Sequence, residues 1–173
     1  MDASREEIEN HIRNNTWDLV KAPQGAIVIG SGWVFRVKRK SDGSIERYKA
    51  RFVAKGYSQR PGYDFCETFA PRFCSASLRL ILALCAQENL HMRSVDISHA
   101  FLNGELTETV YMRQPEGFEE GGADYVCKLN KAIYGLKQAA RHWRNMLREF
   151  LESIGFKVLE SDPSIFIFVK HVE

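Results

Sequence analysis

The 173-residue sequence lacks the patterns that mark membrane, secreted and zinc-binding proteins. It has no apolar run of about 18 residues and no N-terminal signal peptide, so we expect a soluble intracellular protein. Its four cysteines form no CxxC pair and stand beside no paired histidines. A zinc site or a disulfide framework is therefore not expected, and the cysteines are predicted to be buried free thiols.

The common catalytic signatures are also missing. The sequence has no Walker loop, no HExxH and no nucleophile elbow, and the "GSG" at 30–32 is too short for a phosphate-binding loop. The one suggestive carboxylate is Asp96, at the predicted end of a strand, where an acid can meet a metal without being buried unpaired. A turn or cap residue is the plainer interpretation of a lone aspartate in that position.

Positive charge is present, but in one segment. The net charge is only +2, yet residues 33–60 contain nine Lys and Arg against two acids, Asp42 and Glu46. Local basicity within a balanced chain favours a binding surface over a disordered basic tail.

The pair Asp42-Gly43, between two runs rich in aromatic and β-branched residues, predicts a hairpin with a two-residue turn. Alternation then gathers five cations on one face: Arg36, Lys38, Arg47, Lys49 and Arg51. The other face is apolar: Trp33, Phe35, Val37, Tyr48, Ala50 and Phe52. Like charges directly opposite one another cost some tenths of a kcal/mol per pair. Either these cations splay into water, or a polyanion lies across them.

Strands and helices alternate along the rest of the chain. A capping-box pattern at Ser4 and Glu7 predicts a short charged helix at 4–15, and apolar periodicity predicts helices at 75–90 and 136–156. Strands are expected at 16–20, 91–97, 125–129 and 164–170. This order favours an α+β arrangement with helices on one side of a largely antiparallel sheet. The third helix carries a basic flank that a solvated helix face would explain: Lys137, Arg141, Arg144 and Arg148.

Five motifs, taken together, carry a resemblance. "WVFRVKRKSDGSIERYKARFVAKGYSQRPGYDFCETFAP", "VDISHAFLNGEL", "VYMRQPEGF", "KLNKAIYGLKQAARHW" and "SDPSIF" occur in that order. Over roughly residues 15 to 169 the chain resembles the reverse transcriptase domain of copia-type LTR retrotransposons. The resemblance implies the fingers and part of the palm of a right-hand polymerase, and templated DNA synthesis with two Mg²⁺ ions. It divides the chain into a charged lead-in (1–15), a fingers-like part (16–90) with the basic hairpin 33–55, and a partial palm (91–173).

The resemblance also implies roles for single residues. Asp96 matches the first metal-binding, catalytic aspartate of the palm, and Phe101 matches the bulky residue that excludes a ribose 2′-hydroxyl. Gln138 matches a polar residue beside the nucleotide. The expected contacts with the incoming triphosphate and the template are Lys49, Arg51 and Lys55, and the further nucleic-acid contacts are Arg36, Lys38, Arg47, Arg141 and Arg144. The implied partners are an RNA or DNA primer–template and deoxynucleotides, in a cytoplasmic virus-like particle or the nucleus.

The sequence departs from the family at two levels. Ala140 and His142 differ from the family's Lys-Gln-Ala-Pro-Arg-Ala-Trp, and the printed chain ends at Glu173, before the strand and Tyr-Xaa-Asp-Asp that supply the remaining carboxylates. Two-metal catalysis needs carboxylates that bridge both ions, so we expect an incomplete palm sheet and no polymerase activity from these 173 residues. The alternatives are a non-catalytic nucleic-acid-binding module that uses the basic hairpin, or an inert retroelement remnant.

Overall fold

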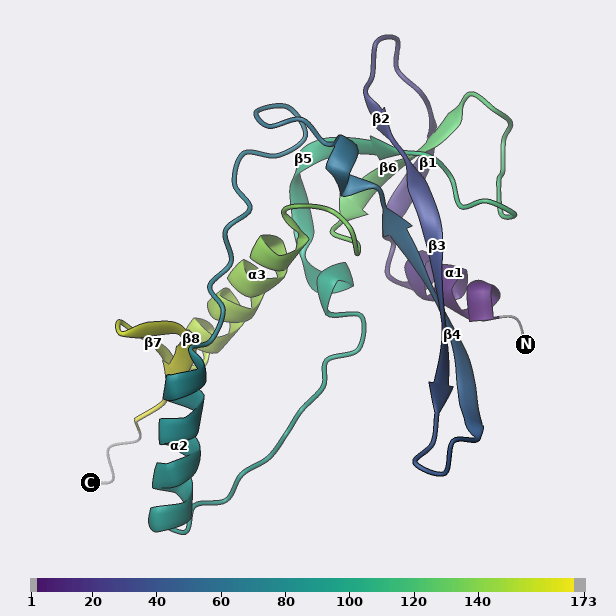
Figure 1. Cartoon of the computed structure of the whole chain (residues 1–173). Helices are drawn as coiled ribbons and strands as arrows, with labels where there is room; N and C mark the ends of the chain where they lie inside the picture. The colour runs from purple at the N-terminus through teal and green to yellow at the C-terminus, as the bar shows by residue number, and fades with distance from the viewer. Residues whose placement is uncertain (1–2, 170–173) are drawn as a thin grey trace.

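A computed structural model describes residues 3–169, and its elements form a mixed α/β domain with three separate sheets (Figure 1). The helices are α1 (Ala3–Arg13), α2 (Ser75–Gln87) and α3 (Ala139–Ser153), with short 3₁₀ turns η1 (Gly56–Ser58) and η2 (Ala100–Asn103). The strands are β1 (Trp17–Lys21), β2 (Val28–Ile29), β3 (Ser31–Arg39), β4 (Ile45–Ala54), β5 (Glu105–Met112), β6 (Tyr125–Lys131), β7 (Lys157–Leu159) and β8 (Asp162–Ile167).

The largest sheet has the strand order β1-β6-β5-β2. The pairs β1–β6 and β5–β6 are antiparallel and only the two-residue strand β2 lies parallel to its neighbour β5, so this sheet is largely antiparallel, as expected. The pairs β3–β4 and β7–β8 form two-stranded sheets of their own. Strands from both proposed segments, 16–90 and 91–173, thus contribute to one sheet.

The hydrophobic core lies where this sheet meets the base of the hairpin. Phe52, Met112 and Ile133 are fully buried, and Ile29 and Val110 are almost as well covered. Each such side chain contributes about 1.5–3 kcal/mol relative to an exposed one. The core therefore holds the base of β4 firmly against the body of the domain.

Helix α1 packs against β4 and closes its outer edge. Glu7 Oε1 accepts the Phe52 N–H at 3.3 Å, and the His11 ring lies edge-on to the Phe52 ring at 5.9 Å. Trp17 lies 4.9 Å from the His11 ring, between centroids. The predicted lead-in helix is thus a structural support of the hairpin.

One predicted strand is absent from residues 3–169, and the third predicted helix begins later than expected. Residues 91–97, expected as a strand, form an irregular connection (Figure 1). Val95 is 82% exposed and Met92 60%, so the apolar pattern there has no sheet to cover in the described chain. Helix α3 begins at Ala139, three residues later than expected, after a turn in which Gly135 adopts a left-handed φ of +93°.

The other predicted elements form within a few residues of their expected limits, and residue 170 of the last strand lies outside the described residues. Gly155, with φ +98°, ends α3: its N–H reaches Glu152 O and the Phe156 N–H reaches Leu151 O. The four cysteines are free, but only Cys127 is buried, while Cys66 and Cys74 are exposed. Burial raises the pKa of the Cys127 thiol to about 12.

Helix α2 stands apart from the rest of the fold, on the opposite arm from the hairpin (Figure 1). None of its residues is buried, and Leu80 is 61% exposed. Its first turn is tied to β8, because Asp162 Oδ2 accepts the Cys74 N–H at 3.0 Å. Of the helices in the described part, none has the length and apolarity needed to cross a membrane.

Candidate nucleic-acid interface

The basic hairpin β3–β4 has the cross-strand register that the sequence predicts. Arg36 lies opposite Lys49, Lys38 opposite Arg47, and Val34 opposite Arg51. The cations of the two strands therefore share one face, and like charges do face each other. No ion pair joins these cations to a carboxylate in residues 3–169, and the nearby charge of Glu7 offsets their repulsion only in part.

The turn itself differs from the prediction. The Gly43 N–H bonds to Lys40 O at 3.0 Å and the Lys40 N–H to Ser44 O at 2.9 Å, which makes a three-residue loop in place of the expected two. Gly43 takes φ +84°, as the left-handed position of such a loop requires, and Asp42 Oδ1 accepts the Ser44 N–H. A register shift next to Lys38 absorbs the extra residue, so the predicted pairs survive.

The cation face borders a cleft of about 620 Å³ that also contains Asp96. The hairpin supplies Lys38, Arg47, Lys49 and Arg51; the segment 96–99, Tyr134 and one side of α1 form the remaining walls. The structure thus brings the proposed catalytic aspartate together with two proposed triphosphate contacts, Lys49 and Arg51, although they are far apart in sequence.

The pKa of Lys49 shows how burial and neighbouring charges act in this cleft. Burial has the largest effect on the pKa of its ammonium group and lowers it. The nearby charges of Arg51, Lys38 and Arg47 lower this pKa further, whereas the charge of Glu7 raises it slightly. The charged form is therefore less favoured in the free protein than it is for a lysine in water. A bound polyanion would reverse that balance, because it supplies the missing opposite charge.

One residue of the cleft was not singled out by the sequence reasoning. The Arg51 guanidinium lies over the Tyr134 ring, 4.8 Å from its centroid, and the Phe101 ring meets the same ring at 4.7 Å. Phe101 is thus connected to the cleft through Tyr134. Neither composition nor periodicity marks Tyr134; its place in the "KAIYGLKQ" motif, directly before a glycine, was the available signal.

Two further predicted residues lie outside the cleft. The exposed Lys55 extends over Gly30 and Gly32 at the base of the hairpin, so closely that a Cβ on Gly30 would stand 2.9 Å from Lys55 Cδ. Gln138 is fully buried, where its Oε1 accepts from Gln59 at 3.0 Å and its Nε2 donates to Asp64 O at 2.9 Å. The Gln138 amide therefore already has hydrogen-bond partners within the protein. A role for Gln138 beside a nucleotide stays a prediction.

The cations of α3 also have protein partners. Arg141 forms an ion pair with Glu67, and Arg144 donates to the carbonyl of Pro163. Unlike the hairpin cations, they need no external anion, and their contacts with nucleic acid stay a prediction.

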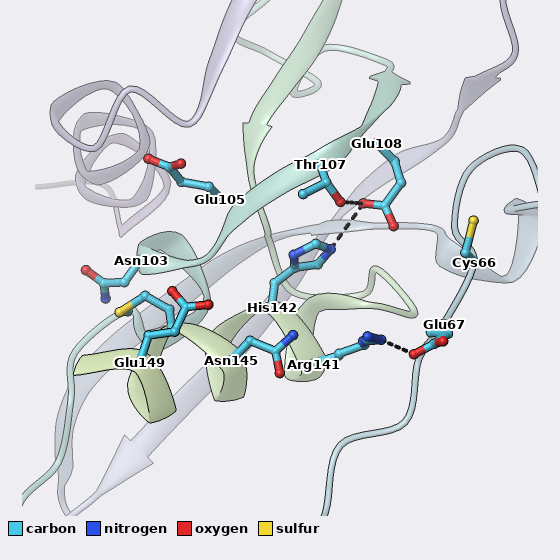
Figure 2. A pocket seen from close by; sticks show the side chains of 11 residues that line it. Cys66, Glu67, Asn103, Glu105, Thr107, Glu108, Arg141, His142, Asn145 and Glu149 are labelled. Carbon is cyan, nitrogen blue, oxygen red and sulfur yellow. Dashed lines mark hydrogen bonds and ion pairs between the residues drawn. The ribbon is translucent and has the colours of Figure 1, made fainter. Parts of the chain in front are cut away.

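A second cleft, of about 710 Å³, lies between α3, β5 and the loop around Cys66 (Figure 2). Figure 2 shows His142 turned toward Glu108, whose Oε2 lies 3.1 Å from His142 Nε2 and accepts from Thr107. His142, one of the two departures from the family motif, therefore ties the start of α3 to β5. Beside it Arg141 reaches Glu67 across the mouth of the cleft.

A complete metal site is absent from residues 3–169, because no group of three or more His, Cys, Asp or Glu side chains there is arranged to hold an ion. In its cleft Asp96 is joined by two other carboxylates, Glu6 and Glu7, and Glu7 is engaged by the Phe52 N–H.

Comparison with known proteins agrees with the motifs. The family model described as "Reverse transcriptase (RNA-dependent DNA polymerase)" matches residues 14–172. The chain is 50% identical over 163 residues to the retrovirus-related Pol polyproteins from transposons RE2 and RE1 of Arabidopsis thaliana, covering 93% of this chain and 11% of each relative. It is 44% identical over 167 residues to that from transposon TNT 1-94 of Nicotiana tabacum, covering 96% of this chain and 13% of the relative.

The chain thus spans about a tenth of the length of these curated relatives. No solved structure matches it significantly. The family match over nearly the whole chain, together with these identities, shows that the chain belongs to the reverse transcriptase family and is a reverse transcriptase-like domain of the copia-type retrotransposon Pol polyproteins.

Proposed function

We propose that this domain binds the primer–template and the incoming deoxynucleotide in RNA-directed DNA synthesis by a longer Pol polyprotein. The observation that carries the proposal is the cleft in which the hairpin cations face Asp96. A row of cations that form no ion pair within residues 3–169 suits a phosphate backbone, whose contacts dominate the affinity for nucleic acid. In this proposal the hairpin belongs to the fingers of a right-hand polymerase and residues 91–173 to its palm.

The residues of the cleft would each contact a different part of the substrates. Lys49 and Arg51 contact the triphosphate, since a guanidinium can hold two phosphate oxygens at once and an ammonium adds a point charge. Lys38, Arg47 and Arg36, on the same face, follow the template backbone. Phe101 limits the space beside the sugar, which selects deoxynucleotides over ribonucleotides.

Mg²⁺ is the cofactor that the family implies. Asp96 is the carboxylate that we propose as this chain's ligand for it, but residues 3–169 do not fit a complete site. Carboxylate oxygens from more than one residue are needed to clamp a pair of ions. We therefore assign no chemical step to the ion here, and propose binding as the activity of the domain itself. We place that activity inside the cell, in a virus-like particle or the nucleus.

The test is binding of a fluorescent RNA–DNA primer–template by the 173-residue chain, measured by anisotropy over a range of salt concentrations. We expect affinity to fall with salt, with a slope of about −0.7 to −0.9 per phosphate contact. Replacement of both Lys49 and Arg51 by Glu should weaken binding at least tenfold at low salt and make the slope shallower by about two contacts.

The matched control is Lys157→Glu, a charge reversal on the exposed strand lysine opposite Ile167, in the two-stranded sheet β7–β8. It should leave both affinity and slope unchanged. If the double reversal on the hairpin also leaves them unchanged, the cation face is not the binding surface and the proposal fails. A loss in the control about half as large as that of the double reversal would point to nonspecific attraction by net charge, because the control changes the net charge by half as much, and would contradict the proposal too.

A further inference from the structure

We propose that Tyr134 is a positioning residue of this cleft: its ring holds the Arg51 guanidinium ready for phosphate on one side and supports Phe101 beside the sugar on the other. The inference deepens the proposed function and rests on it. Its starting point is that a single half-buried ring contacts both residues, at 4.8 Å from the guanidinium and at 4.7 Å from the Phe101 ring.

The two contacts come from different parts of the chain. Arg51 lies on β4, whereas Phe101 lies in η2, which follows the segment with Asp96. Tyr134 lies between β6 and α3 and lines the cleft together with Arg51. It is thus the side chain through which the hairpin contacts the aromatic group of η2.

The backbone holds the tyrosine in place. Tyr134 O accepts the Ala54 N–H at 2.8 Å, so the residue is bonded to the end of β4. The next residue, Gly135, has φ +93°, and a Cβ there would stand 2.0 Å from Ala54 O. On the other side, a Cβ on Gly56 would stand 2.0 Å from Gly135 O. Such close approach of backbones fixes the position from which the ring projects.

The contact matters because Arg51 stands among like charges. Its neighbours on the same face, including Lys49 and Arg47, repel it, as the lowered pKa of Lys49 reflects. Without a partner the guanidinium would turn toward water, and phosphate binding would then cost the conformational entropy of the Arg51 side chain. The face of Tyr134 supplies that partner through a cation–π contact, which leaves the N–H groups of Arg51 free for phosphate oxygens.

The edge-on contact with Phe101 has a second consequence. An aromatic pair in this geometry restricts both rings. If Phe101 is the sugar filter, its position depends on Tyr134. Loss of the Tyr134 ring should therefore reduce discrimination between deoxy- and ribonucleotides as well as affinity.

The experiment measures the affinities of dATP and ATP for the 173-residue chain by titration calorimetry. We expect Tyr134→Ala to weaken dATP binding about three- to tenfold, the range expected for a partly buried cation–π contact. It should also lower the preference for dATP over ATP. Tyr134→Phe keeps the ring and should restore both values to within about twofold, since the contact uses the face of the ring.

The chain offers a matched control in Tyr63. Its ring also carries a guanidinium, that of Arg60 at 5.1 Å, but it lines neither the cleft nor the hairpin. Tyr63→Ala should change neither affinity nor preference. In an Arg51→Ala background, Tyr134→Ala should cost no further dATP affinity but should still lower the preference, because its contact with Phe101 is separate.

The outcomes separate this inference from the function on which it rests. If wild type does not bind dATP, or if Arg51→Ala leaves binding unchanged, the proposed phosphate contact fails and the inference falls with it. If Arg51→Ala weakens binding but a folded Tyr134→Ala does not, only the role of Tyr134 is refuted. Should Tyr134→Ala fail to unfold cooperatively, Tyr134→Leu takes its place; wild-type affinity in that folded variant refutes the inference, and a loss comparable to that of Arg51→Ala supports it.

Discussion

Removing one cation from the hairpin should make the free protein more stable while it weakens binding. Lys49 is the best position for this test, because burial and three neighbouring cations already lower its pKa. It lies directly opposite Arg36 and next but one to Arg47 and Arg51 along β4. We expect Lys49→Gln to raise the free energy of unfolding at low salt.

The magnitude follows from the pairs that disappear. One directly opposed pair of like charges costs some tenths of a kcal/mol, and the neighbours along and across the strands add smaller amounts. The gain should be about 0.5–1 kcal/mol at low salt, or a rise of about 1–4 °C in Tm for a domain of this size. In about 0.5 M salt most of the gain should vanish, because exposed charges are then screened.

The assay is thermal and urea unfolding of wild type, Lys49→Gln and the control Lys157→Gln, each at about 25 and 500 mM salt. The control removes an exposed strand lysine that faces Ile167, and should change stability little at either salt concentration. The reasoning would be refuted if Lys49→Gln lowered stability, or if its gain persisted at high salt. In either case the cations would not be repelling one another, and their lack of carboxylate partners would carry no cost that a ligand could relieve.

Three further predictions concern the supports of the cleft. Burial of the Glu7 carboxylate raises its pKa, but the adjacent His11 ring, whose Nε2 lies 3.6 Å from Glu7 Oε1, and the Phe52 N–H outweigh burial and lower it. Its stabilising effect should therefore be complete above about pH 4.5 and be lost as the pH falls through the folded-state pKa; unfolding curves between pH 3 and 7 should show a flatter profile for Glu7→Gln. Asp162→Ala removes the acceptor at the start of α2 and should speed hydrogen exchange in the first turn of that helix, with unchanged exchange in β4 as the control. Gly135→Ala should cost about 2–4 kcal/mol of unfolding free energy, from a disfavoured φ and a backbone clash. The control is Gly62→Ala, at φ +77° with no atom within 4 Å of the added Cβ, which should cost about 1 kcal/mol. Equal losses of stability in the two variants would show that the backbone clash at Gly135 does not exist.

The hairpin was the part of the fold that the sequence predicted best. Its register follows from local alternation, and the shift near the turn changed only the pair of Arg39, which lies opposite Ile45. The strand expected at 91–97 failed for a physical reason: its apolar pattern specifies a buried face, but burial depends on a neighbouring strand that residues 3–169 do not supply. Local pattern cannot report whether such a partner exists.

In the candidate site, too, the sequence indicates the local motifs but not the contacts between distant segments. The sequence could name Lys49, Arg51 and Asp96 because their motifs are local. The contact of Arg51 with Tyr134 could not be predicted from the sequence, because it depends on how the turn after β6 packs against the end of β4. The internal bonds of Gln138 were hidden in the same way, because Gln59 and Asp64 come from a distant loop.

The pairing of β1 with β6 has a consequence for the order in which the domain assembles. Trp17 pairs with Leu129, whereas the strands of the basic hairpin are joined by a three-residue loop. A hairpin closes in about 1–10 μs, but a ribosome adds only about 5–20 residues per second. On a growing chain the hairpin is complete several seconds before β6 leaves the ribosome, and β1 waits through that interval with its backbone groups unpaired. Translation speed across residues 54–131 therefore sets how long the nascent chain exposes a strand edge open to aggregation.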